Sequence, residues 1–384
     1  MPKHFVRLTI ASQFHLTRQL LMITLLYQTN MKIHFKKSLF FYAFTCALCT
    51  TCLFISCSVD KEKKESEAYT LPDEKKSDPL PSWNESETKQ AIISYVDEVT
   101  DTSNPDFIEI ADRIATFDND GTLWSEQPIY FQLFFAIDRV KAMATDHPEW
   151  KREQPYKAIL ENDMASLSQQ GMKGIMKIIM TTHAGMTEKE FGTIVHDWIS
   201  SARHPLKDKK YTELVFQPML ELLEYLRAND FKTFIVSGGG IDFMRPWAED
   251  VYGIPKDQIV GSSGKVKYDY NEGNPVVRKL PEMDFIDDKE GKPEGIQKYI
   301  GRKPVFAAGN SDGDLQMLRW ADSNELKSFK LYVHHTDSVR EWAYDRNSHI
   351  GKFDKGLDEA RQKGWVIADM KQDWKVIFPF ELIQ

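Results

Sequence analysis

Two aspartates one residue apart are the residues of this chain that most directly indicate chemistry. The segment Ile114–Trp124 has the sequence IATFDNDGTLW, in which a short apolar run ends at Asp118 and Asp120. Such a run is typical of a buried strand that ends in a tight turn. Two carboxylates held this close repel each other unless a cation lies between them. The pattern favours a magnesium ion with a phosphoryl substrate over an ordinary turn built from Asp, Asn and Gly.

Three further polar segments lie at the ends of predicted elements later in the chain. Ser237–Gly240 and Gly309–Asp314 each follow a short apolar run, and Lys292 stands just before a predicted helix. Short apolar runs that alternate with helical patterns predict a parallel sheet with helices on both faces. Ligands bind such sheets at the carboxyl ends of the strands. We therefore expect these three segments to meet the Asp118 turn at one site.

The chain between the first strand and the later ones has a different pattern. Residues 125–212 show apolar residues at helical spacing without strand alternation, and they include a methionine-rich stretch at 164–186. Methionines in such a stripe usually fill a core, and they also suit an adaptable surface over a site. We expect a helical cap at 125–212, inserted into an α/β core formed by 91–124 and 213–384. A hairpin is predicted at 266–280.

In this order, the four segments resemble the motifs of the haloacid dehalogenase superfamily of phosphatases, in particular the branch that includes phosphoserine phosphatase. The resemblance extends over residues 114–317. The matching residues are, in motif order, Asp118–Thr122, Ser237 with Gly238, Lys292, and Asn310 with Asp314. Each motif alone is common, but all four in order are specific. The resemblance implies a three-layer, doubly wound, Rossmann-like parallel-sheet core with a helical cap inserted after the first motif.

The resemblance implies a catalytic role for the first three motifs. Asp118 would be the nucleophile and form an aspartyl-phosphate, which divides hydrolysis into two easier displacements. Asp120 would protonate the leaving oxygen and then activate water. Ser237 and Gly238 would bind the phosphoryl oxygens, and Lys292 would neutralise charge on Asp118 and on the phosphate. Asp120 also argues against dehalogenation, which needs no general acid at that position.

The fourth motif departs from the family pattern at one position. The resemblance implies that Mg²⁺ binds Asp118, Asp120 and the fourth-motif residues Asn310 and Asp314, within a shell of oxygen ligands that keeps some waters. Asn310 stands where an aspartate is usual, and its amide oxygen brings less charge to the metal. Asp312 is an additional carboxylate that could take over this role. The sequence leaves open which of these three residues contacts the metal.

Together these features predict a Mg²⁺-dependent phosphomonoester hydrolase that acts on a small phosphorylated metabolite. The alternative is a non-catalytic protein of the same fold that binds a phosphorylated ligand, with Asn310 as the sign of lost catalysis. Intact Asp118 and Lys292 argue for the enzyme. Glu126 and Gln127 lie near the place where phosphoserine phosphatase holds the amine of its substrate. Their spacing does not match that place, and a surface pair is an equally good interpretation.

The N-terminal residues have the pattern of an export signal. A basic start at 31–37 precedes an uncharged run that ends just before Cys57, so we expect residues 1–56 to be a signal segment with Met31 as the true start. The end of this run resembles a bacterial lipoprotein processing site, and an uncleaved membrane anchor is the alternative. Processing would leave Cys57 lipidated, with palmitate among its acyl chains. The protein would then be tethered to the cell envelope, on the periplasmic or outer-membrane face of a Gram-negative bacterium.

The residues after Cys57 are mostly polar. Residues 57–90 are rich in Lys, Glu, Asp, Ser and Pro, and this composition predicts a flexible tether. All the cysteines lie at or before this tether, at Cys46, Cys49, Cys52 and Cys57. A zinc site made by the first three is the alternative interpretation of their spacing. It is disfavoured because they lie within an apolar run that has no histidine nearby.

The charge of the chain excludes one class of partner. The sequence has 57 acidic and 49 basic residues, which gives a formal net charge of −8. The first 56 residues contain basic side chains and no acidic ones, so the remainder is more acidic than this total. Binding to nucleic acid needs a basic face, and we therefore expect no nucleic-acid partner. The expected partners are a small phosphomonoester and a membrane, and the sequence does not indicate an oligomeric state.

Mass spectrometry of the native protein tests the predicted start of the chain. If Met31 is the true start of the signal, no peptide from residues 1–30 is present in cells that make the protein. The detection of such peptides would contradict this prediction.

Overall fold

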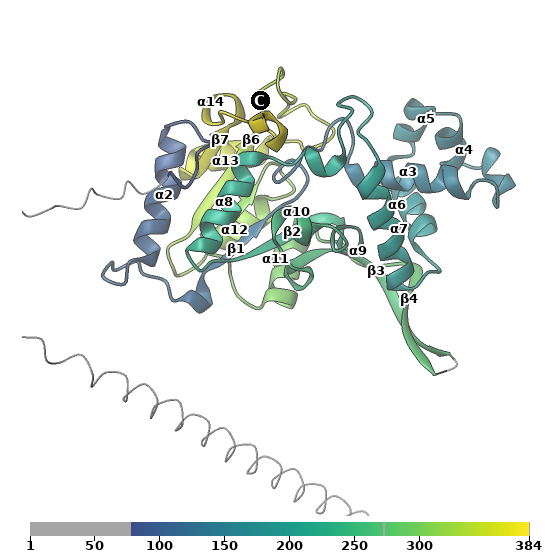
Figure 1. The fold of residues 1–384 in the computed structure, drawn as a ribbon, viewed down its shortest axis with the longest axis horizontal. Helices are drawn as coiled ribbons and strands as arrows, with labels where there is room; N and C mark the ends of the chain where they lie inside the picture. Colours follow the sequence, from purple (N-terminus) through teal and green to yellow (C-terminus); the bar gives the residue numbers. More distant parts are fainter. Residues whose placement is uncertain (1–77, 272, 384) are drawn as a thin grey trace, which may run out of the picture. The chain divides into compact units, whose positions relative to one another are not determined.

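The described residues form an α/β structure built on a seven-stranded sheet (Figure 1). The structure is a computed structural model, and it describes residues 78–271 and 273–383. The predicted signal segment, the Met31 start and the lipidation of Cys57 lie outside these residues. Within the described ranges, no helix combines the length and the apolar character that crossing a membrane requires.

The sheet has the strand order β4-β3-β2-β1-β5-β6-β7, and every neighbouring pair is parallel except β3 with β4. The strands are β1 Ile114–Phe117, β2 Lys232–Gly240, β3 Ile259–Asn271, β4 Asn274–Phe285, β5 Phe306–Gly309, β6 Phe329–His334 and β7 Val366–Asp369. The helices are α2 Glu87–Thr100, α3 Phe131–Met143, α4 Tyr156–Leu160, α5 Met164–Gln169, α6 Gly171–His183, α7 Glu188–Ser201, α8 Gln217–Ala228, α9 Ile241–Met244, α10 Ala248–Tyr252, α11 Gly291–Gly295, α12 Leu315–Asp322, α13 Lys355–Lys363 and α14 Met370–Asp373. This order confirms the predicted parallel sheet and adds strand β7, which the sequence analysis missed.

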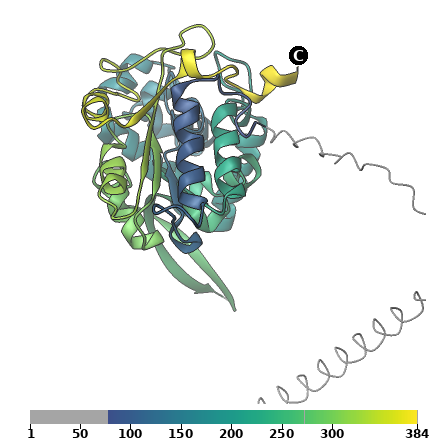
Figure 2. The ribbon, with the colours of Figure 1, turned by 90° about the vertical axis from the view of Figure 1, so that its left-hand side faces the viewer.

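Two apolar layers hold the helices against the two faces of the sheet. In β5, Phe306 and Ala308 belong to one layer, whereas Ala307 between them belongs to the other. This alternation follows from the two-residue period of a strand. Helices α2 and α8 pack in the first layer, and α12 and α13 pack in the second, so helices lie on both sides of the sheet (Figure 2). The predicted three-layer, doubly wound core is confirmed.

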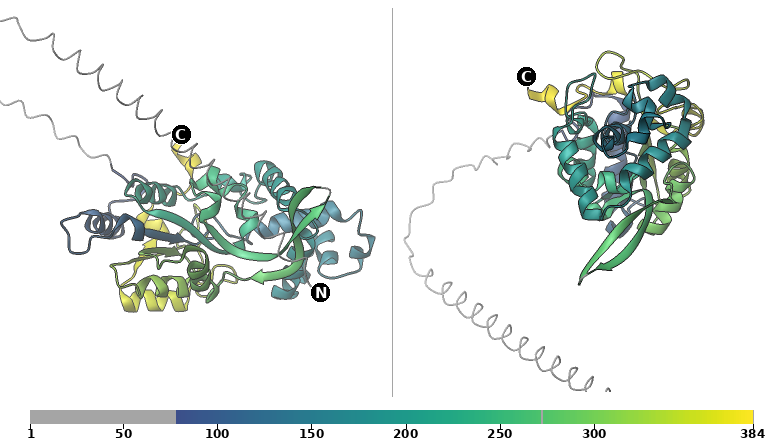
Figure 3. Two further views of the ribbon diagram at one scale, coloured as in Figure 1. Left: turned by 90° about the horizontal axis from the view of Figure 1, so that it is seen from below. Right: turned by 90° about the vertical axis from the view of Figure 1, so that its right-hand side faces the viewer.

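Helices α3–α6 share a core of their own, which includes Trp150 and Tyr156. The hairpin formed by β3 and β4 extends beyond the parallel part of the sheet and runs beside the cap helices (Figures 1 and 3). Strand β4 is bonded to the connection between α6 and α7. The Lys279 amide donates to the Met186 carbonyl, and the Gly185 amide donates to the Lys279 carbonyl. The cap of the structure therefore combines helices from the predicted insertion with the hairpin.

The folded part of the chain begins before the predicted end of the tether at residue 90. Leu80 and Trp83 are fully buried, and helix α2 follows directly. The Trp83 ring meets the Trp374 ring edge to face, with centroids 5.8 Å apart, and its Nε1 donates to the Pro218 carbonyl. The predicted boundary is therefore wrong. The polar composition of 57–90 predicted a flexible tether up to residue 90. Two isolated apolar side chains among many polar ones are nevertheless enough to anchor the end of this segment.

The contact of Trp83 with Trp374 yields a stability prediction. Replacing Trp83 by Ala removes a fully buried indole, and the loss of a buried Trp costs about 3–5 kcal/mol of unfolding free energy. Val339→Ala is the control, because Val339 is exposed and such surface changes stay within about 0.5 kcal/mol. Urea denaturation of the two variants measures both values. Equal midpoints would show that the segment before α2 does not belong to the folded body.

Candidate active site

The carboxyl ends of β1, β2 and β5 bring the predicted motif residues together. Strand β1 pairs in parallel with both β2 and β5, so the residues that end these strands are neighbours. Asp118 follows β1, Ser237 lies near the end of β2, and Asn310 follows β5. Lys292 reaches the same place from the first turn of α11. All four side chains are buried, and the predicted motifs meet at one site.

The Lys292 ammonium is the centre of this site. Its Nζ donates to Asp118 Oδ1 at 2.6 Å, to Asp314 Oδ1 at 2.5 Å and to the Val236 carbonyl at 2.9 Å. Three acceptors match the three hydrogens of an ammonium group. Burial alone would lower the pKa of Lys292, but the charges of Asp118 and Asp314 raise it above its usual value. The lysine therefore stays charged between two carboxylates.

The groups around Asp118 shift its pKa in opposite directions. Burial raises the pKa of Asp118, and so does the charge of Asp314, whereas the Lys292 ammonium lowers it. Only Oδ1 receives the lysine hydrogen bond. The side chain also lines a cavity of about 400 Å³. Asp118 thus presents a carboxylate oxygen to a ligand while a cation fixes its other oxygen.

Asp314 and Asp312 are both engaged in hydrogen bonds within the protein. Asp314 Oδ2 accepts from the amides of Asn310 at 2.9 Å and Ser311 at 3.0 Å, while its Oδ1 accepts from the lysine. Asp312 Oδ1 accepts from the amides of Asp354 and Gly356, so it holds the start of α13. In this arrangement both oxygens of Asp314 brace the Lys292 ammonium and the turn after β5.

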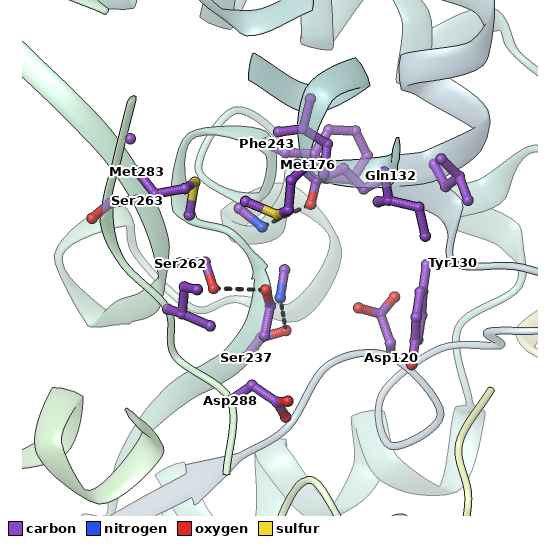
Figure 4. A pocket seen from close by; sticks show the side chains of 18 of the residues that line it. Asp120, Tyr130, Gln132, Met176, Ser237, Phe243, Ser262, Ser263, Met283 and Asp288 are labelled. Atoms are coloured by element: carbon purple, nitrogen blue, oxygen red, sulfur yellow. Dashed lines mark hydrogen bonds between the residues drawn. The ribbon is translucent and has the colours of Figure 1, made fainter. Parts of the chain in front are cut away.

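Ser237 and the glycines after it form a cradle of backbone groups. The Gly239 amide donates to Ser237 Oγ at 3.1 Å, and the Ser262 hydroxyl donates to the Gly238 carbonyl at 2.8 Å (Figure 4). The pairing of β2 with β3 shifts register between Ser237 and Gly240, which turns this backbone out of the regular ladder. Such a turn with a buried serine suits the binding of phosphoryl oxygens.

Asp120 faces the cavity opposite this cradle, beside Tyr130 (Figure 4). Its Oδ1 accepts a hydrogen bond of 2.8 Å from the Trp124 indole. Burial raises the pKa of Asp120 to about 6, although the hydrogen bond from Trp124 lowers it. A carboxyl group with such a pKa exchanges its proton near neutral pH, as a general acid and base must.

The position of Glu126 does not follow from the sequence pattern. Its side chain is only 2% exposed and lines the cavity. Its Oε1 accepts hydrogen bonds from Asn310 Nδ2 at 2.7 Å and from the Tyr344 hydroxyl at 2.8 Å. Burial and the charge of Asp120 raise the pKa of Glu126, and the Tyr344 bond lowers it. The interpretation of Glu126 as a surface residue is therefore wrong.

The glycine of the first motif allows this carboxylate to approach. Gly121 has a φ of +75°, and a Cβ there would lie 2.0 Å from Asn310 Nδ2 and 2.4 Å from Glu126 Oε1. A side chain at this position is therefore excluded both by conformation and by space. His335 Nε2 donates to the Gly121 carbonyl at 2.7 Å and so fixes the turn. This contact could not be predicted from local sequence, because His335 lies more than two hundred residues after Gly121 in the chain.

This geometry agrees with a comparison of the sequence with protein families. The family model described as haloacid dehalogenase-like hydrolase matches residues 115–319, which is more than half of the chain. The chain belongs to this family. The matched range includes all four motifs and the cap between them. No curated protein matches the sequence.

The comparison with solved structures found matches of low sequence identity, among them the following three. A conserved protein of unknown function from Anaerococcus prevotii is 15% identical, with a TM-score of 0.47, over 74% of this chain and 91% of that one. A phosphoserine phosphohydrolase-like protein from Francisella tularensis is 16% identical, with a TM-score of 0.33, over 59% and 89%. A probable phosphoserine phosphatase from Vibrio cholerae is 14% identical, with a TM-score of 0.33, over 67% and 69%.

The charge balance around Lys292 can be tested through stability. Lys292→Met leaves Asp118 and Asp314 buried without their cation, and breaking a buried pair in this way costs about 3–5 kcal/mol. Lys265→Met is the control, because Lys265 pairs with Glu282 on the surface, where a pair contributes at most about 1 kcal/mol. Chemical denaturation near neutral pH measures both. A Lys292→Met variant as stable as wild type would mean that the two aspartates are uncharged in the fold.

Proposed function

We propose that this hydrolase is a Mg²⁺-dependent phosphomonoesterase that acts through an aspartyl-phosphate on residue 118. One observation carries the proposal: the ammonium of Lys292 fixes one oxygen of Asp118 in a cavity that also contains Asp120 and the backbone cradle at Ser237. A nucleophile, a proton donor and a group that binds phosphoryl oxygens are what hydrolysis of a phosphate ester requires. The family supports hydrolysis, and these residues support the phosphoester as its substrate.

The chemistry divides into two displacements at phosphorus. In the first, an oxygen of Asp118 forms a bond to phosphorus while the bond to the leaving oxygen breaks, and Asp120 gives its proton to that oxygen. In the second, Asp120 takes a proton from water as the water oxygen attacks phosphorus. The acyl phosphate breaks, inorganic phosphate leaves, and Asp118 and Asp120 return to their starting states. Lys292 and the Ser237 cradle balance the charge on the phosphoryl oxygens throughout.

The oxygen atoms around the first and fourth motifs fit a magnesium ion. The described residues contain no cluster of three His, Cys, Asp or Glu side chains arranged for a metal. Magnesium does not need one, because it binds through one or two carboxylates and keeps several waters. We assign its protein ligands to Asp118, Asp120 and Asn310, and Asp314 to bracing. When bound, the ion would supply positive charge to the phosphoryl oxygens.

Glu126 supplies the carboxylate that Asn310 lacks. An aspartate in place of Asn310 would add a negative charge beside a buried glutamate whose Oε1 lies 2.7 Å from the position 310 amide. Two carboxylates in that contact would repel each other, whereas an amide donates a hydrogen bond. The asparagine and the glutamate are therefore complementary. Together they bring one carboxyl group to this side of the proposed metal site.

The assignment of Glu126 predicts a loss of metal affinity. Glu126→Gln weakens Mg²⁺ binding by about 10- to 100-fold, and the double variant Glu126→Gln/Asn310→Asp recovers affinity because the carboxylate returns on the neighbouring side chain. Isothermal titration and the Mg²⁺-induced rise of the melting temperature measure this without any substrate. Glu188→Gln, at an exposed position of α7, is the control. An unchanged Mg²⁺ affinity in Glu126→Gln would contradict the assignment.

Phosphate release from p-nitrophenyl phosphate tests the proposed activity. The wild type releases phosphate when Mg²⁺ is present, and Asp118→Asn lowers the rate by roughly 10³-fold or more, because the nucleophile is lost. Asp197→Asn, exposed on α7, keeps the wild-type rate. Full activity in Asp118→Asn would refute the nucleophile. If the wild type releases no phosphate from a broad panel of phosphoesters, the alternative of a protein that only binds a phosphorylated ligand is favoured instead.

A further inference from the structure

The cavity over Asp118 has two chemically different ends. Its floor carries the acids, the lysine and the serine already described. Its far wall is mainly apolar and comes from the cap and from α9, with Ile175, Met176, Ile179 and Met180 from α6, Phe243 from α9 and Met283 from β4. In Figure 4, Met176, Phe243 and Met283 lie on the far side of Ser237 from Asp288. A phosphoryl group bound at the floor would direct its leaving group toward this wall.

The charged groups near the apolar wall are already paired. The Lys279 ammonium is bonded to the Asp242 carboxylate, and it also lies 5.0 Å from the centre of the Phe191 ring. The ring nitrogens of His183 contact Gln132 Nε2 at 3.3 Å and Thr182 Oγ1 at 2.8 Å. Burial lowers the pKa of His183 to about 3, so the ring is neutral. A second anionic group on the substrate would find no free cation at this end.

Acidic side chains outnumber basic ones around the cavity. The lining includes Asp118, Asp120, Glu126, Asp242, Asp288 and Asp314, against Lys279 and Lys292. The site thus repels a leaving group that carries a carboxylate or a second phosphate. Asp242 is bonded to a lysine, and the other acids lie beside the phosphoryl position. Among the residues that the structure describes, the apolar wall therefore offers no carboxylate that could bind an amine on the substrate.

The size of the cavity exceeds what phosphate needs. Its volume is about 400 Å³, whereas one water takes up about 30 Å³ of liquid. Pockets of this size bury drug-sized organic ligands. Methionine side chains in the wall adapt to different apolar shapes because they are unbranched and polarizable.

The geometry points to a phosphomonoester with an uncharged, largely apolar leaving group, such as an aryl alcohol or a medium-chain alkyl alcohol, as the substrate class. This inference rests on the proposed phosphatase function. Burying each methylene of an alkyl chain against the wall favours the bound transition state by about fourfold in kcat/KM. The gain ends when the chain fills the cavity.

A series of alkyl phosphates tests the inference on the full chain with Mg²⁺. We expect kcat/KM to rise by about fourfold per methylene from methyl to n-butyl phosphate, and to be higher still for n-hexyl phosphate. The matched comparison is a hexyl phosphate whose chain ends in a carboxylate. Its kcat/KM is lower than that of n-hexyl phosphate by about tenfold or more, because the charge would have to enter the apolar wall. Phosphoserine, phosphocholine and a sugar phosphate are poorer substrates than n-hexyl phosphate.

A charged side chain introduced into the apolar wall provides a second, independent test of the inference. Met176→Lys raises the ratio of the carboxylate-ended substrate to n-hexyl phosphate by about tenfold, because the ammonium pairs with the carboxylate. Met164→Lys is the matched control, since Met164 is exposed on α5 and does not line the cavity. It leaves the ratio unchanged.

The possible outcomes separate this inference from the proposed function. Phosphate release from every ester with a flat alkyl series, or with a preference for phosphoserine, phosphocholine or the carboxylate-ended chain, overturns the inference and leaves the phosphatase standing. No release from any ester, p-nitrophenyl phosphate included, overturns the proposed function itself. A rising series together with the shifted ratio in Met176→Lys supports both.

Discussion

A single buried ammonium ties the candidate site together. Lys292 reaches the ends of β1 and β2 and the turn after β5 by bonding Asp118, the Val236 carbonyl and Asp314. Buried charges are tolerated only when they are paired and fully hydrogen-bonded, and this lysine meets both conditions. The hydrogen bond that offsets the buried charge of Asp118 also holds this side chain in the orientation that the proposed reaction needs. Structure and function therefore depend on one interaction.

The fourth motif shows how charge can be redistributed within such a site. Asn310 gives up a carboxylate, and Glu126 brings one to the same place from the loop after the first motif. Tyr344 donates a hydrogen bond to the same oxygen of that glutamate, and Gly121 leaves room for it. The carboxyl group at this place therefore comes from the connection after β1, whereas Asn310 follows β5. Under the proposed function, the asparagine belongs to the magnesium site and is not a sign of lost catalysis.

The sequence predicts those residues whose placement follows from local pattern. Asp118, Ser237 and the turn at Asn310 each end an apolar strand, and parallel strands must align their carboxyl ends, so their meeting could be foreseen. Glu126 could not, because its burial depends on Asn310 and Tyr344, which are distant in sequence. Nor could the packing of Trp83 on Trp374 or the bonding of the hairpin to the cap, since neither follows from periodicity. The sequence pattern of the cap predicted helices, and the apolar wall became visible only when α6, α9 and β4 were brought together.

The covalent step at Asp118 is the centre of this account. It can be tested by mixing the Asp120→Asn variant with p-nitrophenyl phosphate and Mg²⁺, quenching in acid and reducing with borohydride, which converts an aspartyl-phosphate to homoserine. The variant can still form the intermediate on a good leaving group, but it activates water poorly, so the intermediate accumulates. Peptide mass spectrometry should then find homoserine at residue 118, and not in Asp118→Asn/Asp120→Asn treated in the same way. An active enzyme with no modification at residue 118, or with the modification at another aspartate, would contradict the account.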